Sequence, residues 1–249
     1  MKAINQLPLA VQLPDDETFS SYFGQTNQVI VSQLKQLILP IKFPNAVNHG
    51  AIIQPKIKSV YMFGQSGVGK SHLLHACCAL ASDENKSSVC LSFSELKHLS
   101  VELLEGLEQI DIVCLDDIQL IQGNALWQQA VFDLFNRMIE QDHLLIISGD
   151  QSVQQLPLTL PDLKSRLSWG MIAQLKPLTD EEKMQALQGR AKQRGLVLQD
   201  DAVKFLFNRL SREMTNLIAC LEKLDQASIR EQRKITIPFI KEVLGIKPI

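Results

Sequence analysis

The hydrophobic pattern predicts alternating strands and helices over the first two thirds of the chain. Short runs of consecutive apolar residues are typical of strands buried on both faces, and they are separated by stretches with apolar residues three and four apart. We expect strands at residues 59–63, 89–93, 110–115, 144–148 and 171–175. This alternation predicts an α/β fold, with a parallel sheet covered by helices on both faces.

Helical spacing of apolar residues fills the stretches between these strands. A helix is expected after a glycine cluster, where Leu73, Leu74, Cys77 and Leu80 share one face, and residues 94–107 are expected to be mostly helical. An amphipathic helix is predicted from Trp127, Ala130, Val131, Leu134, Phe135, Met138 and Ile139. Residues 15–39 predict a further helix that ends at Pro40, with Val29, Leu34, Leu37 and Ile38 as its apolar stripe.

Beyond Pro177 the pattern is helical only. Thr179 and Glu182 have the spacing of a helix capping box, and two helical stripes follow it. These stripes consist of Val203, Leu206, Phe207 and Leu210, and of Leu217, Ile218, Leu221 and Leu224. We therefore expect an extended arm over residues 1–14, an α/β nucleotide-binding domain over 15–177 and a small all-helical domain over 178–249.

Composition excludes several classes of protein. The 249 residues are 45% hydrophobic and 21% charged, with a formal net charge of −2, as in ordinary globular proteins. The sequence contains no apolar run of the length of a membrane span and no signal peptide pattern at its N-terminus, so we expect a cytoplasmic protein. The near-neutral charge argues against binding of nucleic acid over the whole surface. Any contact with DNA is expected to be local or made through another protein.

The cysteines and histidines predict no metal centre. Five cysteines, an odd number, occur in apolar surroundings without C-x-x-C spacing: Cys77, Cys78, Cys90, Cys114 and Cys220. Small buried thiols are the expected interpretation. His72 and His75 have a permissible ligand spacing, but the sequence offers no evident third or fourth ligand.

A complete phosphate-binding motif connects the first strand to the following helix. The pattern G-x-x-x-x-G-K-[ST] is matched by Gly64, Gln65, Ser66, Gly67, Val68, Gly69, Lys70 and Ser71. The glycines allow backbone N–H groups to face a polyphosphate at a helix N-terminus. Lys70 would reach the β- and γ-phosphates, and the hydroxyl of Ser71 would bind Mg²⁺.

Two carboxylates follow the strand at 110–115. We expect Asp116 to lie on the metal side of the phosphate site and Asp117 to orient the attacking water. An exposed aspartate that caps the next segment is the alternative for Asp117.

Two arginines complete the expected site. Arg166 follows the strand at 144–148 and precedes the last strand, a place from which a side chain can project beyond its own subunit. Arg212, expected at the start of a helix, would face the phosphates from the helical domain. For both residues, an ordinary solvated surface charge is the alternative.

Together these motifs resemble the AAA+ family, and more closely its initiator clade, typified by DnaA. The segments GQSGVGKSHLLHA, CLDDIQL, LLIISGD, DLKSRLSWG and SREMTNL carry the resemblance, over residues 19–244. The resemblance implies a P-loop AAA+ core with a helical lid, an adenine nucleotide (ADP or ATP) and Mg²⁺. It also implies that Phe19 and the segment after it lie near the nucleobase, that Asp150 occupies a sensor position, that Arg212 is the lid sensor, and that Arg166 is an arginine finger.

An initiator carries a further DNA-binding domain after the lid, whereas this sequence ends at Ile249. That plan resembles the DnaA-related regulators of replication initiation. Gln6, Leu7, Pro8 and Leu9 resemble the Q-L-x-L peptide by which bacterial proteins dock on the sliding clamp, although residues 155–158 repeat it inside the folded domain. The resemblance implies a negative regulator that, on the DNA-loaded clamp, supplies Arg166 in trans to ATP bound on DnaA.

Two other functions remain open. One is a self-contained ATPase, such as a helicase loader or a transposition ATPase. However, the usual sensor asparagine or threonine is missing from the stretch Ser148, Gly149 and Asp150, which predicts weak hydrolysis in the chain's own site. The other is a DNA-binding initiator fragment, which is suggested by the basic residues Arg230, Arg233 and Lys234. The sequence leaves open the nucleobase, the phosphate number and whether a nucleotide-dependent homo-oligomer forms.

Overall fold

The computed structural model describes residues 17–40 and 57–246, and a five-stranded parallel sheet forms the centre of this region. The strands are β1 (Ser59–Phe63), β2 (Ser88–Ser92), β3 (Ile112–Asp116), β4 (Leu144–Gly149) and β5 (Met171–Gln174). They lie in the order β2-β3-β4-β1-β5, and all neighbours are parallel. The predicted parallel sheet is confirmed, and the carboxyl ends of β1, β3 and β4 meet at one edge.

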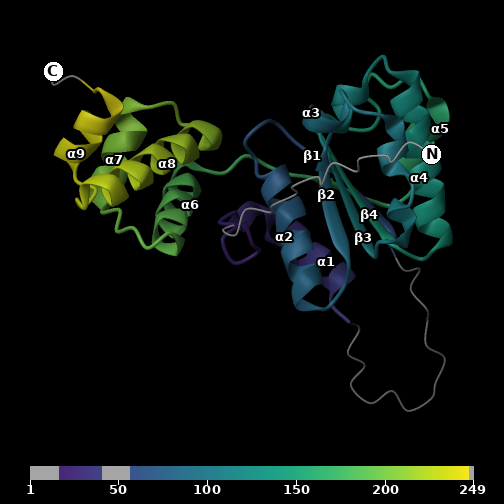
Figure 1. Cartoon of the computed structure of the whole chain (residues 1–249), viewed down its shortest axis with the longest axis horizontal. Coiled ribbons are helices and arrows are strands. Elements are labelled where there is room, and N and C mark those ends of the chain that lie inside the picture. The colour runs from purple at the N-terminus through teal and green to yellow at the C-terminus, as the bar shows by residue number, and fades with distance from the viewer. Residues whose placement is uncertain (1–16, 41–56, 247–249) are drawn as a thin grey trace, which may run out of the picture.

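Helices cover both faces of the sheet (Figure 1). One face carries α1 (Gln28–Ile38) and α2 (Lys70–Asp83), and the other carries α3 (Phe93–Leu96), α4 (Ala125–Glu140) and α5 (Pro161–Leu167). Alternate residues of β4 point to opposite faces of the sheet. Ile146 packs on the α2 side, whereas Leu145 and Ile147 pack on the α4 side. Full burial on both sides explains why the strands appear as continuous apolar runs.

Within the described residues, the chain then forms four helices with a core of their own. They are α6 (Asp180–Gln193), α7 (Asp200–Arg209), α8 (Met214–Glu231) and α9 (Ile237–Leu244). Leu187, Leu206, Leu221 and Phe239 are fully buried among them. The predicted capping box is present at the start of α6, where the Thr179 hydroxyl accepts from the N–H of Glu182 at 3.2 Å. The expected helical lid is confirmed, and its separate core supports the proposed division near Leu178.

Two expected helices are much shorter in the structure. Within residues 17–39 the α-helix begins only at Gln28, because Ser21 bonds both the N–H and the carbonyl of Thr18 and so closes a turn in place of helix bonds. Val29 is 70% exposed, and Val31 takes its place in the buried stripe. Residues 94–107 form only the end of α3 and separate 3₁₀ turns, with Gly106 in a left-handed conformation.

Other expectations concern the surface and the thiols. Cys77, Cys78, Cys90 and Cys114 are buried as predicted, whereas Cys220 is only half-buried. Across the described residues, every helix is too short or too polar to cross a membrane. The predicted arm and its docking peptide, Gln6, Leu7 and Leu9, lie outside the described residues.

Candidate functional site

The phosphate loop lies at the carboxyl edge of the sheet, between β1 and α2. Gly67 and Gly69 have φ values of +80° and +92°, which L side chains rarely adopt. A Cβ on Gly69 would also lie 2.7 Å from the ring of Tyr22. The motif therefore needs glycine at position 69 for backbone conformation and for the close approach of the segment that covers the loop.

Lys70 and Ser71 begin α2 and face two different sets of oxygens. The ammonium of the buried Lys70 donates to the carbonyls of Gly64 and Gln65, at 2.9 and 3.3 Å. The Ser71 hydroxyl donates to Asp116 Oδ2 at 2.5 Å. Lys70 is thus held by the loop itself, at the wall of the pocket described below.

Asp116, at the end of β3, joins three elements. It accepts from Ser71 of α2 and, through its other oxygen, from Ser148 of β4. Ser148 in turn accepts from the backbone N–H of Asp117 at 3.1 Å. A hydroxyl and a buried carboxylate side by side are the hard oxygen ligands that Mg²⁺ prefers, so this donor set fits the predicted metal.

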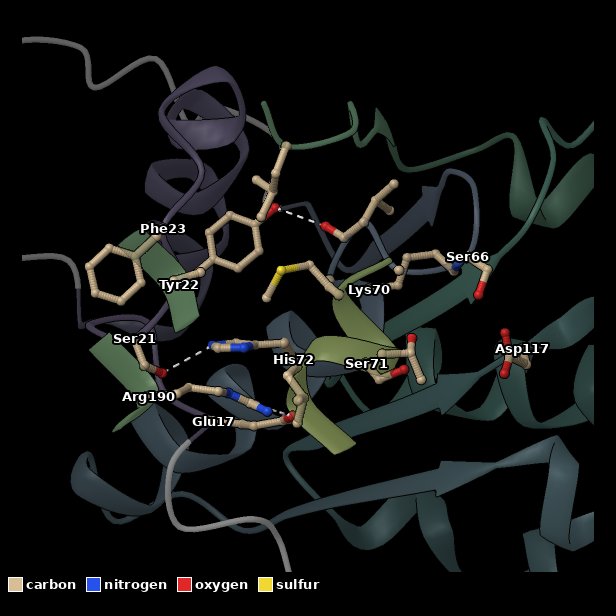
Figure 2. Close-up of a pocket in the computed structure, with 18 residues that line it drawn as sticks. Glu17, Ser21, Tyr22, Phe23, Ser66, Lys70, Ser71, His72, Asp117 and Arg190 are labelled. Carbon is tan, nitrogen blue, oxygen red and sulfur yellow. Dashed lines mark hydrogen bonds and ion pairs between the residues drawn. The ribbon is translucent and has the colours of Figure 1, made fainter. Parts of the chain in front are cut away.

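Asp117 has a left-handed backbone, with φ of +61°, a conformation that aspartate tolerates better than most residues. Asp117 lines the pocket described below (Figure 2). Its Oδ1 accepts from the side-chain amide of Gln119 at 2.9 Å. Its position on the pocket wall is compatible with the predicted role of orienting water.

The pocket lies between the phosphate loop and the lid (Figure 2). Its walls come from residues 66–72, from the segment 17–23 that precedes α1, and from α6 and α8. The lining residues outside the phosphate loop are Glu17, Ser21, Tyr22, Phe23, His72, Asp117, Leu178, Ala186, Arg190, Met214, Thr215 and Ile218. Apolar groups of the lid face the predicted phosphate loop of the core, an arrangement that fits a nucleotide.

Glu17 connects the core to the lid at the mouth of this pocket. Its carboxylate accepts from His75 Nδ1 of α2 at 2.5 Å and from the guanidinium of Arg190 of α6. Burial opposes ionisation, but the hydrogen bonds from His75 and Arg190 outweigh it and lower the pKa of Glu17 to about 2. Burial also lowers the pKa of His75, but the hydrogen bond and charge of the same carboxylate outweigh this effect and raise it. Glu17 is therefore a largely buried anion that links α2 to α6.

Tyr22 connects the same segment to the phosphate loop. Its hydroxyl donates to the carbonyl of Val68 at 3.2 Å and accepts from Asn27 at 2.9 Å. Burial raises the pKa of Tyr22 to about 12, so the hydroxyl keeps its proton and remains a donor. Glu182 of α6 also bonds this segment, accepting from the N–H of Gln25 at 2.7 Å.

The structure brings together only part of the predicted set. Ser66 to Ser71 and Asp117 line the pocket, with Asp116 behind them. Gly64, Gln65 and Asp150 line a separate hollow at the ends of β1, β4 and β5. Phe19 packs beside α1 and α2, whereas Tyr22 and Phe23 of the segment after it reach the pocket.

Arg212 and Arg166 lie away from this pocket. Arg212 precedes α8 instead of opening it, is 59% exposed in its side chain, and pairs with Asp180 at 2.6 Å. Its predicted contact with phosphates stays a prediction. Arg166 lies on α5, where its guanidinium carbon is 4.4 Å from the ring centre of Trp169 and 5.9 Å from that of Phe132.

The sequence predicts no role for Glu17 or Arg190, and Tyr22 enters it only within the segment after Phe19 that the resemblance places near the nucleobase. One signal in the sequence could have identified Arg190. It falls four residues after the buried Ala186 on the apolar stripe of α6, and an arginine is rarely buried unless it has a partner. Glu17 and Tyr22 follow no motif or period, and their roles depend on how the segment folds over α2. The basic residues Arg230 and Arg233 are paired locally, with Glu231 and, for Arg233, also Glu242.

Comparison with known proteins defines the class to which this fold and site belong. A model described as the bacterial DnaA ATPase domain matches residues 45–174, which is more than half of the chain. The chain therefore belongs to the bacterial DnaA ATPase-domain family, with an AAA+ core and a helical lid. A second model, described as the lid domain of Hda, matches residues 180–244, so a DnaA-type ATPase core and an Hda-type lid occur together in this chain.

Solved structures show the same fold. Domain III of the replication initiation protein DnaA of Thermotoga maritima is 19% identical, with a TM-score of 0.75, and the match covers 95% of this chain and all of that one. AMPPCP-bound DnaA of Aquifex aeolicus is 19% identical with a TM-score of 0.64, over 94% of this chain and 68% of that one. The Holliday junction branch migration motor RuvB of Thermotoga maritima is 14% identical with a TM-score of 0.62, over 94% and 72%.

Proposed function

We propose that the chain holds an adenine nucleotide in the pocket between core and lid and acts as a negative regulator of replication initiation. Residues 66–71 would hold the phosphates, with Ser71 and Asp116 as Mg²⁺ ligands; the ion would neutralise phosphate charge. The comparison with AMPPCP-bound DnaA supports this assignment, since the relative with that ligand shares the fold. Phe23, Met214 and Ile218 provide the apolar wall on which a base would lie.

The regulatory step would be made on another molecule. Docked in the cytoplasm on the DNA-loaded sliding clamp through Gln6, Leu7 and Leu9, the chain would supply Arg166 to ATP bound on DnaA and promote its hydrolysis. The observation that carries this proposal is the position of Arg166 and the absence of a paired carboxylate among the described residues. Its charge lies outside the chain's own pocket, and among the described residues no carboxylate pairs with it. An arginine supplied in trans raises hydrolysis by about 10³ to 10⁵.

The chain's own nucleotide would be largely structural. The Ser148 hydroxyl donates to Asp116, and the exposed Asp150 lines a hollow apart from the pocket, so we expect neither to act on a γ-phosphate. We expect slow hydrolysis by the isolated chain. Rapid turnover that is lost in Asp117→Ala would instead favour the self-contained ATPase.

The decisive assay measures hydrolysis of DnaA-bound ATP with clamp and DNA present. Arg166→Ala is expected to reduce the stimulated rate to the unstimulated level. Arg209→Ala is a matched control, because Arg209 also stacks on an aromatic ring, that of Phe205 at 5.9 Å, but lies on α7 of the lid. Unchanged stimulation by Arg166→Ala would refute the proposed role. Steeply salt-dependent binding of DNA by the isolated chain would favour the initiator fragment.

A further inference from the structure

Trp169 is a large aromatic residue whose exposure has no explanation in the packing of the core. It follows α5 directly and is 68% exposed, whereas Trp127 on α4 is 2% exposed inside the core beside Phe93. A side chain that remains mostly in water contributes little apolar burial to stability. Its contact with Arg166 is therefore the feature to explain.

The turn that ends α5 fixes Trp169 beside Arg166. The N–H of Trp169 donates to the carbonyl of Arg166 at 3.0 Å, and the N–H of Ser168 donates to the carbonyls of Lys164 and Ser165. The guanidinium carbon of Arg166 then lies 4.4 Å from the centre of the Trp169 ring. On α4, Phe132 provides a second ring at 5.9 Å, so two elements contribute aromatic groups to one guanidinium.

An aromatic ring holds a guanidinium in a different way than a carboxylate does. The ring attracts the positive charge through its face and restricts the side chain, but it uses none of the five N–H donors and cancels none of the charge. A carboxylate would occupy those donors and neutralise the charge that a phosphate needs. Aromatic support is thus suited to an arginine whose anion is brought by another molecule.

We propose that Trp169 is a positioning residue that keeps Arg166 ordered and charged for a polyphosphate presented by a partner. This inference rests on the proposed function of Arg166 and adds to it the residue through which the arginine is held. The Trp169 ring restricts the guanidinium before the partner docks, so less side-chain freedom is lost in the transition state.

The test is the stimulated-hydrolysis assay, with the chain titrated to saturation. Trp169→Ala is expected to lower the maximal stimulated rate about two- to fivefold, as for loss of an exposed cation–π contact. The concentration that gives half-maximal stimulation should stay unchanged, and Trp169→Phe should restore most of the rate. Val197→Ala, at another exposed apolar residue, is the control.

Three results would overturn the inference. A wild-type maximal rate in Trp169→Ala would show that Arg166 needs no support. A change confined to the concentration for half-maximal stimulation would make Trp169 a docking residue. If Arg166→Ala alone left stimulation intact, the proposed function would fail and the inference with it. The first two results leave the proposed function standing.

Discussion

Replacing Glu17 by glutamine tests whether a largely buried anion holds the lid against the core. The carboxylate is 16% exposed and lies between His75 of α2 and the almost fully buried Arg190 of α6. Glutamine has nearly the same volume, so the substitution removes the charge without opening a cavity. It removes the carboxylate that pairs with the buried guanidinium of Arg190.

The pKa of Glu17 gives the magnitude. A carboxyl group with a pKa of about 2 in the folded chain and 4.5 in the unfolded chain contributes about 3 kcal/mol to the free energy of unfolding at neutral pH. Breaking a buried ion pair by removing one partner costs about 3 to 5 kcal/mol, which agrees. We expect Glu17→Gln to lower the free energy of unfolding by about 3 kcal/mol.

The pH dependence has opposite signs for the two partners. The folded pKa of Glu17 is lowered, so its contribution is complete above about 4.5 and is lost as the pH falls toward 2. The folded pKa of His75 is raised, so its contribution is complete below 6.5 and is lost as the pH rises through the folded value. Their combined contribution is therefore largest between about pH 4.5 and 6.5, and Glu17→Gln should remove it.

Urea unfolding at about pH 3, 5.5 and 8 measures both effects. Glu140→Gln, at an exposed glutamate that ends α4, is the matched control and should leave the free energy of unfolding unchanged. A difference below about 1 kcal/mol between Glu17→Gln and the wild type at pH 5.5 would contradict this prediction, since the anion would then contribute no more than a surface ion pair.

Three further outcomes are expected. Lys70→Ala should weaken nucleotide binding in calorimetry at least about tenfold, while the exposed control Lys97→Ala does not; equal affinities would remove Lys70 from the phosphate site. Gly69→Ala should cost about 1 to 2 kcal/mol of unfolding free energy from its positive φ alone, and more if Tyr22 moves; an unchanged unfolding midpoint would contradict this. Glu182→Gln should cost about 1.5 to 3 kcal/mol, because its carboxylate accepts three backbone N–H groups, and a neutral result in urea would show that water replaces them.

The phosphate side of the site could be predicted because its determinants are local. Gly67, Gly69 and Lys70 act through backbone conformation and charge within one loop, and Asp116 simply ends a buried strand. Of the helix expected over residues 15–39, the described part from residue 17 forms an α-helix only from Gln28, and side-chain bonds of Ser21 close a turn at residues 18–21 that hydrophobic spacing does not reveal. Arg212 shows the same limit, since its pairing with Asp180 depends on how α6 and α8 pack.

Hydrophobic periodicity and glycine spacing extend over only a few residues, so the sequence alone was enough to predict the sheet, the lid and the phosphate loop. Only the tertiary structure decided that Glu17 and Tyr22 cover α2, that Arg190 rather than Arg212 faces the pocket, and that Trp169 supports Arg166. These contacts depend on the directions in which separate elements meet. A contact between residues 173 positions apart, such as that of Glu17 with Arg190, cannot be predicted from a local sequence pattern.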